Sequence, residues 1–191
     1  MKIGIDISQL THQGTGVEKY LKNLVTTLLK TDKENDYILF FSSLRRKLDY
    51  SFINKLTGSR VEIKIFHFPP LLLDFIWNRI HVFPIEYLIG NVDIFISSDW
   101  TQPPTLKAKK ATILYDLIVY KYPEETHNKF SFNPIKLLVS PNIVESQKRR
   151  LFWVKNEVDL VFCISQATKE DAKKILGIEG QKLKVIYPGT S

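Results

Sequence analysis

The stretch that decides the fold is KIGIDISQL at residues 2–10, followed by HQGTG at residues 12–16 and VEKYLKNLVTTLL at residues 17–29. It predicts an apolar strand, a flexible loop and an amphipathic helix, because apolar side chains recur at helical spacing from Val17 to Leu29. Open α/β sheets bind ligands beyond the carboxyl ends of their strands, beside helix N-termini. Gly14 and Gly16 therefore predict a loop whose backbone can approach a ligand closely.

The glycine loop does not match the common nucleotide-binding motifs. Lys19 stands where a dinucleotide-binding loop has its third glycine, and the strand expected at Tyr37–Phe41 runs into Ser42-Ser43 rather than an acidic residue. No Gly-Lys-Ser/Thr follows the glycines, which excludes a Walker loop. The loop is thus expected to admit a ligand without enclosing it.

Composition indicates one ordinary α/β domain over residues 1–191, with 44% apolar and 25% charged residues. Cys163 is the only cysteine, and neither a signal peptide nor a membrane-spanning run is recognisable, so a cytoplasmic location is expected. The net charge of +7 favours anionic partners such as nucleotide phosphates or an anionic membrane surface. Nucleic acid is disfavoured because no recognised binding module is present.

Strand and helix patterns alternate along the chain, which predicts a Rossmann-like, mostly parallel seven-stranded sheet with helices on both faces. Strands are expected at Lys2–Ile7, Tyr37–Phe41, Val61–Ile65, Val92–Ile96, Ala111–Tyr115, Asp159–Ile164 and Leu183–Tyr187. Helices are expected at residues 17–30, 52–56, within 69–90, at 143–156, and from a capping box at Thr168–Asp171 to Gly177. The apolar stretch Leu71–Ile89 fits either a core helix or an amphipathic surface for a lipid-linked molecule.

Five short segments carry a family resemblance. They are GTGVEKY at 14–20, ILYDLI at 113–118, YPE at 122–124, ISQATKED at 164–171 and VIYPGT at 185–190. In this order they resemble the N-terminal domain of GT-B-fold glycosyltransferases, and in particular the retaining family 4. The resemblance covers essentially the whole chain and implies one half of a GT-B architecture, with the C-terminal donor-binding domain absent.

The resemblance implies a function as the acceptor-binding half of a hexosyltransferase. Such an enzyme transfers a hexose from a nucleotide diphosphate sugar to a hydroxyl of a glycan or lipid-linked saccharide. It uses the nucleotide sugar as co-substrate, with no further cofactor and no metal. The isolated chain is expected to be inactive, because a missing domain or a partner subunit would supply the donor site. The alternative is a non-catalytic partner subunit of a split glycosyltransferase, or a degenerate sugar-binding domain.

The candidate site residues are those that lie in the resembling segments or at the carboxyl ends of the predicted strands. Gly14, Thr15 and Gly16 are expected to close over the donor phosphates, although a simple strand-to-helix turn explains them too. Asp116 is the tentative catalytic residue, with a turn-forming role as its alternative. The residues expected to bind the acceptor are Trp100, Tyr115, Ser165, Gln166 and His12. Tyr115 replaces the histidine of the family pattern, and a phenol does not copy the charge of an imidazole.

Overall fold

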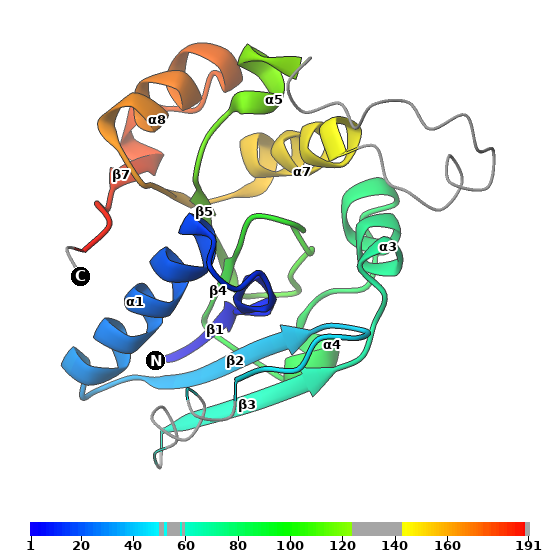
Figure 1. Cartoon of the computed structure of the whole chain (residues 1–191), viewed down its shortest axis with the longest axis vertical. Coiled ribbons are helices and arrows are strands. Elements are labelled where there is room, and N and C mark those ends of the chain that lie inside the picture. The colour runs from blue at the N-terminus through cyan, green and yellow to red at the C-terminus, as the bar shows by residue number, and fades with distance from the viewer. Residues whose placement is uncertain (50–51, 53–57, 59, 124–142, 190–191) are drawn as a thin grey trace.

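The computed structural model describes residues 1–49, 52, 58, 60–123 and 143–189. Within them, seven strands form a single sheet in the order β3-β2-β1-β4-β5-β6-β7, and every neighbouring pair is parallel (Figure 1). The strands are β1 (Lys2–Asp6), β2 (Asp36–Ser42), β3 (Val61–Phe66), β4 (Ile94–Ser97), β5 (Lys109–Leu114), β6 (Leu160–Cys163) and β7 (Leu183–Val185). The predicted Rossmann-like sheet is confirmed.

Helices connect the strands. The α-helices are α1 (Gly16–Thr31), α3 (Pro70–Leu73), α4 (Glu86–Ile89), α5 (Ile118–Lys121), α7 (Ile143–Glu157) and α8 (Gln166–Asp171). The π-helical segments are η2 (Asp74–Arg79) and η4 (Ala172–Leu176), and the 3-10 segments are η1 (Ser8–Thr11) and η5 (Gly180–Lys182). The helix that the sequence predicts at residues 52–56 lies outside the described residues, except for Phe52.

Some local boundaries differ from the prediction. Strand β4 begins two residues later than expected, at Ile94, and β5 begins two residues earlier, at Lys109. Asp93 lies just before β4, and its carboxylate accepts a hydrogen bond from the Lys2 amide (2.7 Å). The helix after β6 is capped by Ser165, whose hydroxyl accepts a hydrogen bond from the Thr168 amide (3.0 Å). Thr168 is itself inside the helix, so Thr168–Asp171 is not a capping box. The helical segment does end at Gly177, in the left-handed region (φ 68°).

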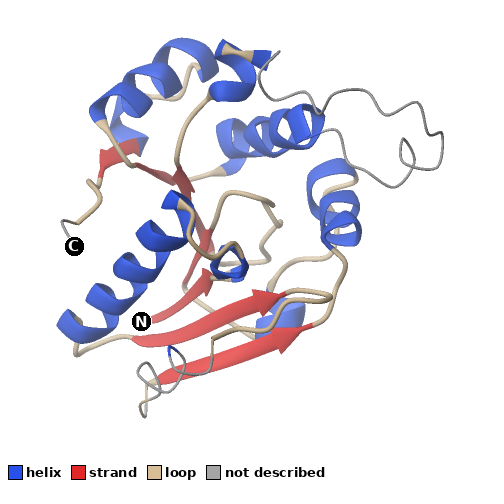
Figure 2. Ribbon diagram, in the orientation of Figure 1, coloured by secondary structure: helices blue, strands red, loops and turns tan. Residues whose placement is uncertain are grey.

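The two faces of the sheet are covered unequally. The chain moves in one direction along the sheet from β1 to β3 and in the other from β3 through β4 to β7. Because parallel crossovers are right-handed, the first connections lie on one face and the later ones on the other. Helix α1 accordingly packs on the first face, whereas α3, α4, α7 and α8 lie across the sheet from it (Figure 2).

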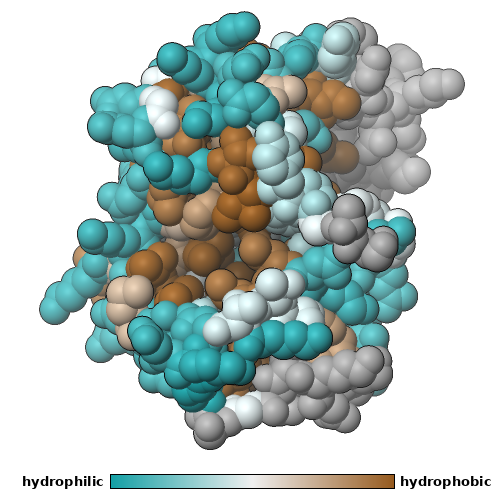
Figure 3. Space-filling model, turned by 90° about the vertical axis from the view of Figure 1, so that its left-hand side faces the viewer, coloured by the Kyte–Doolittle hydropathy of each residue, from teal (hydrophilic) through white to brown (hydrophobic). Residues whose placement is uncertain are grey.

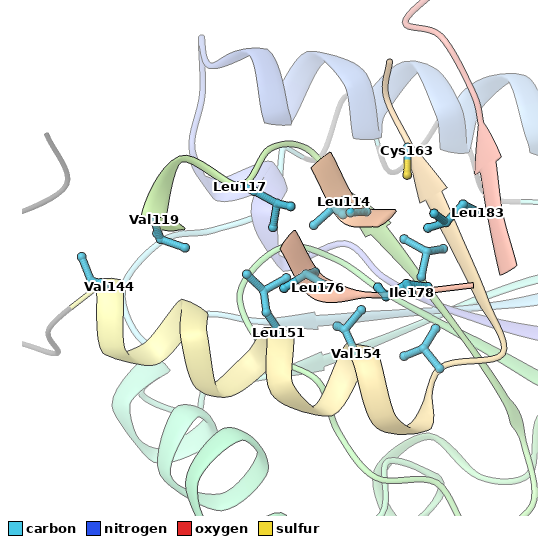
Figure 4. Close-up of a cluster of buried hydrophobic side chains, with 13 residues drawn as sticks. Leu114, Leu117, Val119, Val144, Leu151, Val154, Cys163, Leu176, Ile178 and Leu183 are labelled. Atoms are coloured by element: carbon cyan, nitrogen blue, oxygen red, sulfur yellow. The ribbon is translucent and has the colours of Figure 1, made fainter. Parts of the chain in front are cut away.

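Three apolar clusters fill the space between the sheet and its helices. The α1 side buries Leu21 and Val25 against the sheet. On the other face, Leu151 and Val154 of α7 point toward Leu176 and Ile178 (Figure 4). Cys163 belongs to this second cluster as a fully buried thiol, and burial raises its pKa to about 11. Burial on both faces explains the continuous apolar runs of β2 and β5, whereas β4 and β6 alternate between buried and half-buried positions.

Gly4 in β1 permits the close approach of a third cluster. A Cβ at this position would lie 2.8 Å from Phe95 Cδ2 and 2.9 Å from Ile89 Cδ1, and both side chains are buried. We expect Gly4→Ala to lower the free energy of unfolding by about 1–3 kcal/mol, because the neighbours must move within a packed core. Urea denaturation measures the change. Gly180→Ala is the control, since a Cβ there meets nothing within 4 Å. Equal midpoints for the two variants would contradict the prediction.

Candidate functional site

The candidate site lies at the carboxyl edge of the sheet, where β1 adjoins β4 and the strand order reverses. Asp6 ends β1 and is buried. Its carboxylate accepts hydrogen bonds from the Ser98 hydroxyl (3.1 Å) and the Ser8 amide (2.9 Å). Burial raises the pKa of Asp6, and these hydrogen bonds oppose that rise. Asp6 therefore joins the ends of the two strands that flank the reversal point.

Arg150 of α7 lies beneath this edge with none of its side chain exposed to solvent. Its Nη2 donates to the carbonyls of Ser98 (2.9 Å) and Ile113 (3.0 Å) and to Thr112 Oγ1 (2.9 Å). Its Nη1 donates to Asp99 Oδ1 (3.3 Å). Burial lowers the pKa of this guanidinium, and the facing carboxylate of Asp99 opposes the shift. One buried cation thus connects the carboxyl ends of β4 and β5 to α7.

The segment after β4 is held from two further directions. Gln147 of α7 donates from its Nε2 to the Asp99 carbonyl (2.7 Å). Asn78 of η2 donates to the Trp100 carbonyl (3.1 Å) and accepts from the Gln102 amide (3.0 Å). The position of Asp99 is therefore set by backbone bonds as well as by Arg150.

Three carboxylates, Asp6, Asp99 and Asp116, lie close enough to Arg150 to interact with its charge. Burial raises the pKa of Asp99 to about 6, Arg150 opposes the shift, and Asp116 adds to it. The Asp99 side chain is still 29% exposed, and Asp116 is exposed just beyond β5. Asp116 also forms a turn, because its Oδ1 accepts from the Ile118 amide (3.0 Å). Two accessible carboxyl groups can accept hydrogen bonds from hydroxyls, whereas they repel phosphate.

The glycine loop is closed by its own helix. Thr15 is the N-cap of α1, and its hydroxyl accepts from the Glu18 amide (3.2 Å). The Glu18 carboxylate in turn accepts from the Gly14 amide (3.2 Å), as in a capping box. Gly14 has a φ of 82°, whereas Gly16 is an ordinary helical residue. The Gly14 amide, which was predicted to face donor phosphates, is thus bonded to a carboxylate of the chain itself.

His12 lies on the exposed side of the same loop. The Arg46 Nη1 atom is 3.5 Å from its Nδ1 and donates to the Thr11 carbonyl (2.7 Å). Partial burial, and then the charge of Arg46, lower the pKa of His12. His12 therefore faces a cation rather than the carboxylates of the strand ends.

The two aromatic candidates lie deeper than the sequence indicates. Tyr115 is 5% exposed, and its ring packs edge-on against Tyr20 with centroids 5.5 Å apart. Burial, and then the charge of Asp99, raise the pKa of its hydroxyl. Trp100 is half-buried rather than exposed, and neither its Nε1 nor the Tyr115 hydroxyl has a hydrogen-bond partner in the structure. Both residues lie beside the site, with Tyr115 as part of the core.

The structure brings some of the predicted residues together and separates others. Tyr115 and Asp116 lie near Arg150 at the end of β5, whereas Trp100 follows β4, where its carbonyl accepts a hydrogen bond from Asn78. Ser165 serves as the cap of α8, and Gln166 is exposed on that helix, where its Nε2 donates to Glu170 (3.4 Å). The roles predicted for these residues toward a ligand stay predictions.

Sequence reasoning missed Asp6, Arg150 and Glu18. Each had a detectable signal. Asp6 is a carboxylate inside an apolar strand. Arg150 precedes Leu151 and lies four residues before Val154, so helical spacing places it on the side of the helix that faces the core. Thr15 and Glu18 match the capping-box spacing.

The described residues contain no cluster of three or more His, Cys, Asp or Glu side chains suited to hold a metal ion. None of the helices in this part of the chain has the length and apolarity needed to cross a bilayer.

Comparison with known proteins relates the fold to one solved enzyme. The whole chain superimposes on part of the apo form of the lipopolysaccharide outer core galactosyltransferase WaaB, with a TM-score of 0.52 and 15% identity. This chain shares its fold. It spans 46% of the length of that protein, which is less than half. No protein-family model matches the chain, and no curated protein sequence is similar to it. Membership of family 4 therefore stays a prediction.

The raised pKa of Asp99 predicts a pH-dependent stability. An acid whose pKa is higher in the folded than in the unfolded state stabilises fully below its ordinary value of 3.8, and this contribution is lost as the pH rises through about 6. We expect Asp99→Asn to gain stability relative to the native chain by about 2 kcal/mol as the pH rises from about 4 to about 7. Urea denaturation across this range measures the difference. Asp36→Asn, at the opposite edge of the sheet, is the control. Parallel curves for Asp99→Asn and the native chain would refute the assignment.

Proposed function

We propose that this chain is the acceptor-binding half of a glycosyltransferase. The whole enzyme would transfer a hexose from a nucleotide diphosphate sugar to a hydroxyl of a glycan or lipid-linked saccharide. The observation that carries the proposal is the pair of accessible carboxyl groups, Asp99 and Asp116, beside the reversal point of the sheet. The shared fold with part of a galactosyltransferase agrees with it.

The electrostatics favour an acceptor over a donor at this edge. Hydroxyl groups of a saccharide are neutral donors that a carboxylate can orient. A diphosphate needs cations or free amides, but Arg150 is buried and the Gly14 amide is bonded to Glu18. We infer that the second half of the enzyme neutralises the diphosphate. Catalysis would then consist of positioning and electrostatic stabilisation, in a retaining, metal-independent reaction.

In this proposal Asp116 orients the reacting acceptor hydroxyl and Asp99 holds a neighbouring one. The buried Arg150 would position Asp99 without touching the substrate. Trp100 would supply an apolar surface beside the saccharide. The glycine loop Gly14–Gly16 would bound the acceptor site rather than bind phosphate.

One observation favours a second candidate function. Tyr115 stands where the family pattern has histidine, and its phenol is buried in the core. No side chain at that position is then available to exchange a proton with the acceptor. A non-catalytic subunit of a split glycosyltransferase, or a degenerate sugar-binding domain, would tolerate this replacement.

We expect the 191-residue chain to bind saccharides but to turn over no nucleotide sugar. A saccharide array identifies a ligand, calorimetry gives its affinity, and a coupled assay with common nucleotide sugars tests turnover. Asp116→Asn keeps the oxygen that accepts from Ile118 but removes the charge, and it should weaken saccharide binding about tenfold. Asp36→Asn should bind as the native chain does.

The outcomes separate the candidates. Turnover by the pure chain would overturn the half-enzyme proposal, and an absence of saccharide binding would remove the acceptor site. A complex with a donor-binding polypeptide that transfers sugar favours the enzyme. A complex that binds both ligands without turnover favours the non-catalytic subunit.

We further propose that the chain works in the cytoplasm as a peripheral protein at an anionic membrane surface. The support is an exposed apolar surface on η2 and the residues after it, formed by Phe75, Ile80, Val82, Phe83 and Tyr87. The two acids of this stretch, Asp74 and Glu86, are 4% and 6% exposed, whereas Arg79 is exposed. Aromatic and aliphatic side chains beside a base suit the interface of an anionic bilayer.

Vesicle co-sedimentation tests the membrane proposal. The chain should sediment with phosphatidylglycerol-containing vesicles and less with pure phosphatidylcholine vesicles. Phe75→Ser combined with Ile80→Ser should lower partitioning at least tenfold, because two apolar side chains leave the interface. Ile175→Ser, an exposed residue on η4, is the control. Equal sedimentation of the double variant and the native chain would contradict the proposal.

A further inference from the structure

Four exposed bases lie at the carboxyl edge on the other side of β1 from Asp99. They are His12, in the loop before α1, and Arg45, Arg46 and Lys47, in the segment after β2. We define these four residues as the basic cluster. Strands β2 and β4 flank β1, so their carboxyl ends lie about 10 Å apart. The edge therefore carries accessible acids on one side of β1 and bases on the other.

Hydrogen bonds and a buried leucine hold Arg46 in place. Its Nη1 donates to the Thr11 carbonyl (2.7 Å), which belongs to the segment after β1. Its amide donates to the hydroxyl of Ser43 (3.0 Å), a buried residue. Leu48 follows the basic residues and is 6% exposed within the apolar cluster on the α1 side. The guanidinium is thus fixed before any ligand binds, which lowers the entropic cost of binding.

The charge of Arg46 and His12 is not balanced by an acid. The Arg46 Nη1 lies 3.5 Å from His12 Nδ1, and partial burial, followed by the charge of Arg46, lowers the pKa of His12. Within the described part of the chain, none of the three bases after β2 forms an ion pair with a carboxylate. The carboxylate of Glu18 in α1 instead accepts from the Gly14 amide (3.2 Å) and pairs with Lys22 (3.8 Å). An anion bound between Arg46 and His12 would offset their repulsion.

Exposure alone does not identify a binding site. Hydrophilic side chains are common over the surface, and they surround the apolar middle of the side on which α1 lies (Figure 3). The basic cluster differs in two ways. Its bases come from two segments that a hydrogen bond joins, and it lies at the carboxyl edge, where open α/β sheets bind their ligands.

The charges at the edge indicate the chemistry of the ligand. A guanidinium and an imidazole both donate hydrogen bonds to phosphate oxygens, and a guanidinium can do so with two N–H groups at once. A phosphate ester carries up to two negative charges, so it matches several bases better than a carboxylate does. Asp99 and Asp116 repel a phosphate but accept from hydroxyls. A phosphorylated saccharide would therefore bind in one orientation, with its phosphate toward the bases.

We propose that the basic cluster binds a phosphate group of the acceptor, which makes the acceptor a phosphorylated saccharide. This inference rests on the proposed function, in which this half of the enzyme binds the acceptor. The bases lie two strands away from Asp99, within reach of a saccharide that Asp99 and Asp116 hold. His12 is then a ligand-binding residue, as the sequence predicts, but it binds phosphate rather than a sugar hydroxyl.

The test compares saccharides in pairs that differ only in a phosphate ester. The probes are glucose, galactose, mannose and N-acetylglucosamine, with the 1-phosphate and 6-phosphate of each. Calorimetry with the 191-residue chain should show at least one phosphorylated sugar binding about tenfold more tightly than its parent. Arg46→Gln should abolish this difference, and Arg45→Gln combined with Lys47→Gln, which leaves the bond to Thr11 intact, should reduce it. Arg79→Gln, at an exposed base on η2, is the matched control and should preserve it.

Nuclear magnetic resonance gives a second readout. The phosphorylated sugar should raise the pKa of the His12 imidazole, because a nearby anion favours the charged form, and the parent sugar should leave this pKa unchanged. His12→Gln assigns the resonance.

Several results would overturn the proposal. Equal affinities within every pair would do so while leaving the acceptor proposal standing, provided that the parent sugars bind. An unchanged difference in the folded Arg46→Gln variant, as judged by circular dichroism, would do so as well. Uridine diphosphate that raises the His12 pKa and displaces the sugar phosphate would identify a donor site. Loss of vesicle sedimentation in Arg46→Gln would identify lipid headgroups as the ligand. Binding of no saccharide, phosphorylated or not, would overturn the proposed function together with this inference.

Discussion

The buried guanidinium of Arg150 is the interaction on which the carboxyl edge depends. Desolvation of a cation costs several kcal/mol unless its donors are matched. Here two carbonyls, a hydroxyl and the Asp99 carboxylate accept from its Nη1 and Nη2, while its Nε has no partner among the described residues. All of the accepting groups belong to β4, β5 or the segments that follow them. Because these partners lie on different elements, the ion fixes α7, two strand ends and Asp99 relative to one another.

The same arrangement determines what the edge can bind. The Arg150 guanidinium is buried and bound by groups of the protein itself, whereas Asp99 and Asp116 remain accessible to a ligand. The cap of α1, formed by Thr15 and Glu18, also disfavours an anionic ligand. The reason is that the Gly14 amide already donates to Glu18 and is not free to bind a ligand. An edge with accessible carboxylates, a buried cation and a Gly14 amide already bonded to Glu18 suits neutral hydroxyls. The proposed division between an acceptor half and a donor half follows from this distribution of charge.

A second constraint is the direction in which the chain crosses the sheet. Reversal between β1 and β4 creates the crevice at the carboxyl edge, and it also sends the later helices to one face. The fold thus acquires a candidate ligand site at the carboxyl edge from the same reversal that places the later helices on one face.

Local patterns in the sequence were sufficient to predict the seven strands, the parallel sheet, helix α1 and the buried thiol of Cys163. These features depend on periodicity and apolar character over a few residues. Local patterns failed where neighbouring signals compete, as at Ser165 and Thr168, where two residues can each cap a helix. They also left the burial of Tyr115 undecided, because a strand-end position does not tell whether a ring points to the core or to solvent.

The sequence by itself determined the class of fold and the strand ends at which a site could form. Only the tertiary structure decided which strand ends adjoin, and which charges are neutralised there. Asp6 meets Ser98 across 92 residues of chain, and Arg150 meets Thr112 across 38. Contacts between residues so far apart in the chain cannot be recognised from the periodicity of the sequence. Each residue fits the strand or helix pattern of its own segment, whichever residue it contacts in the fold.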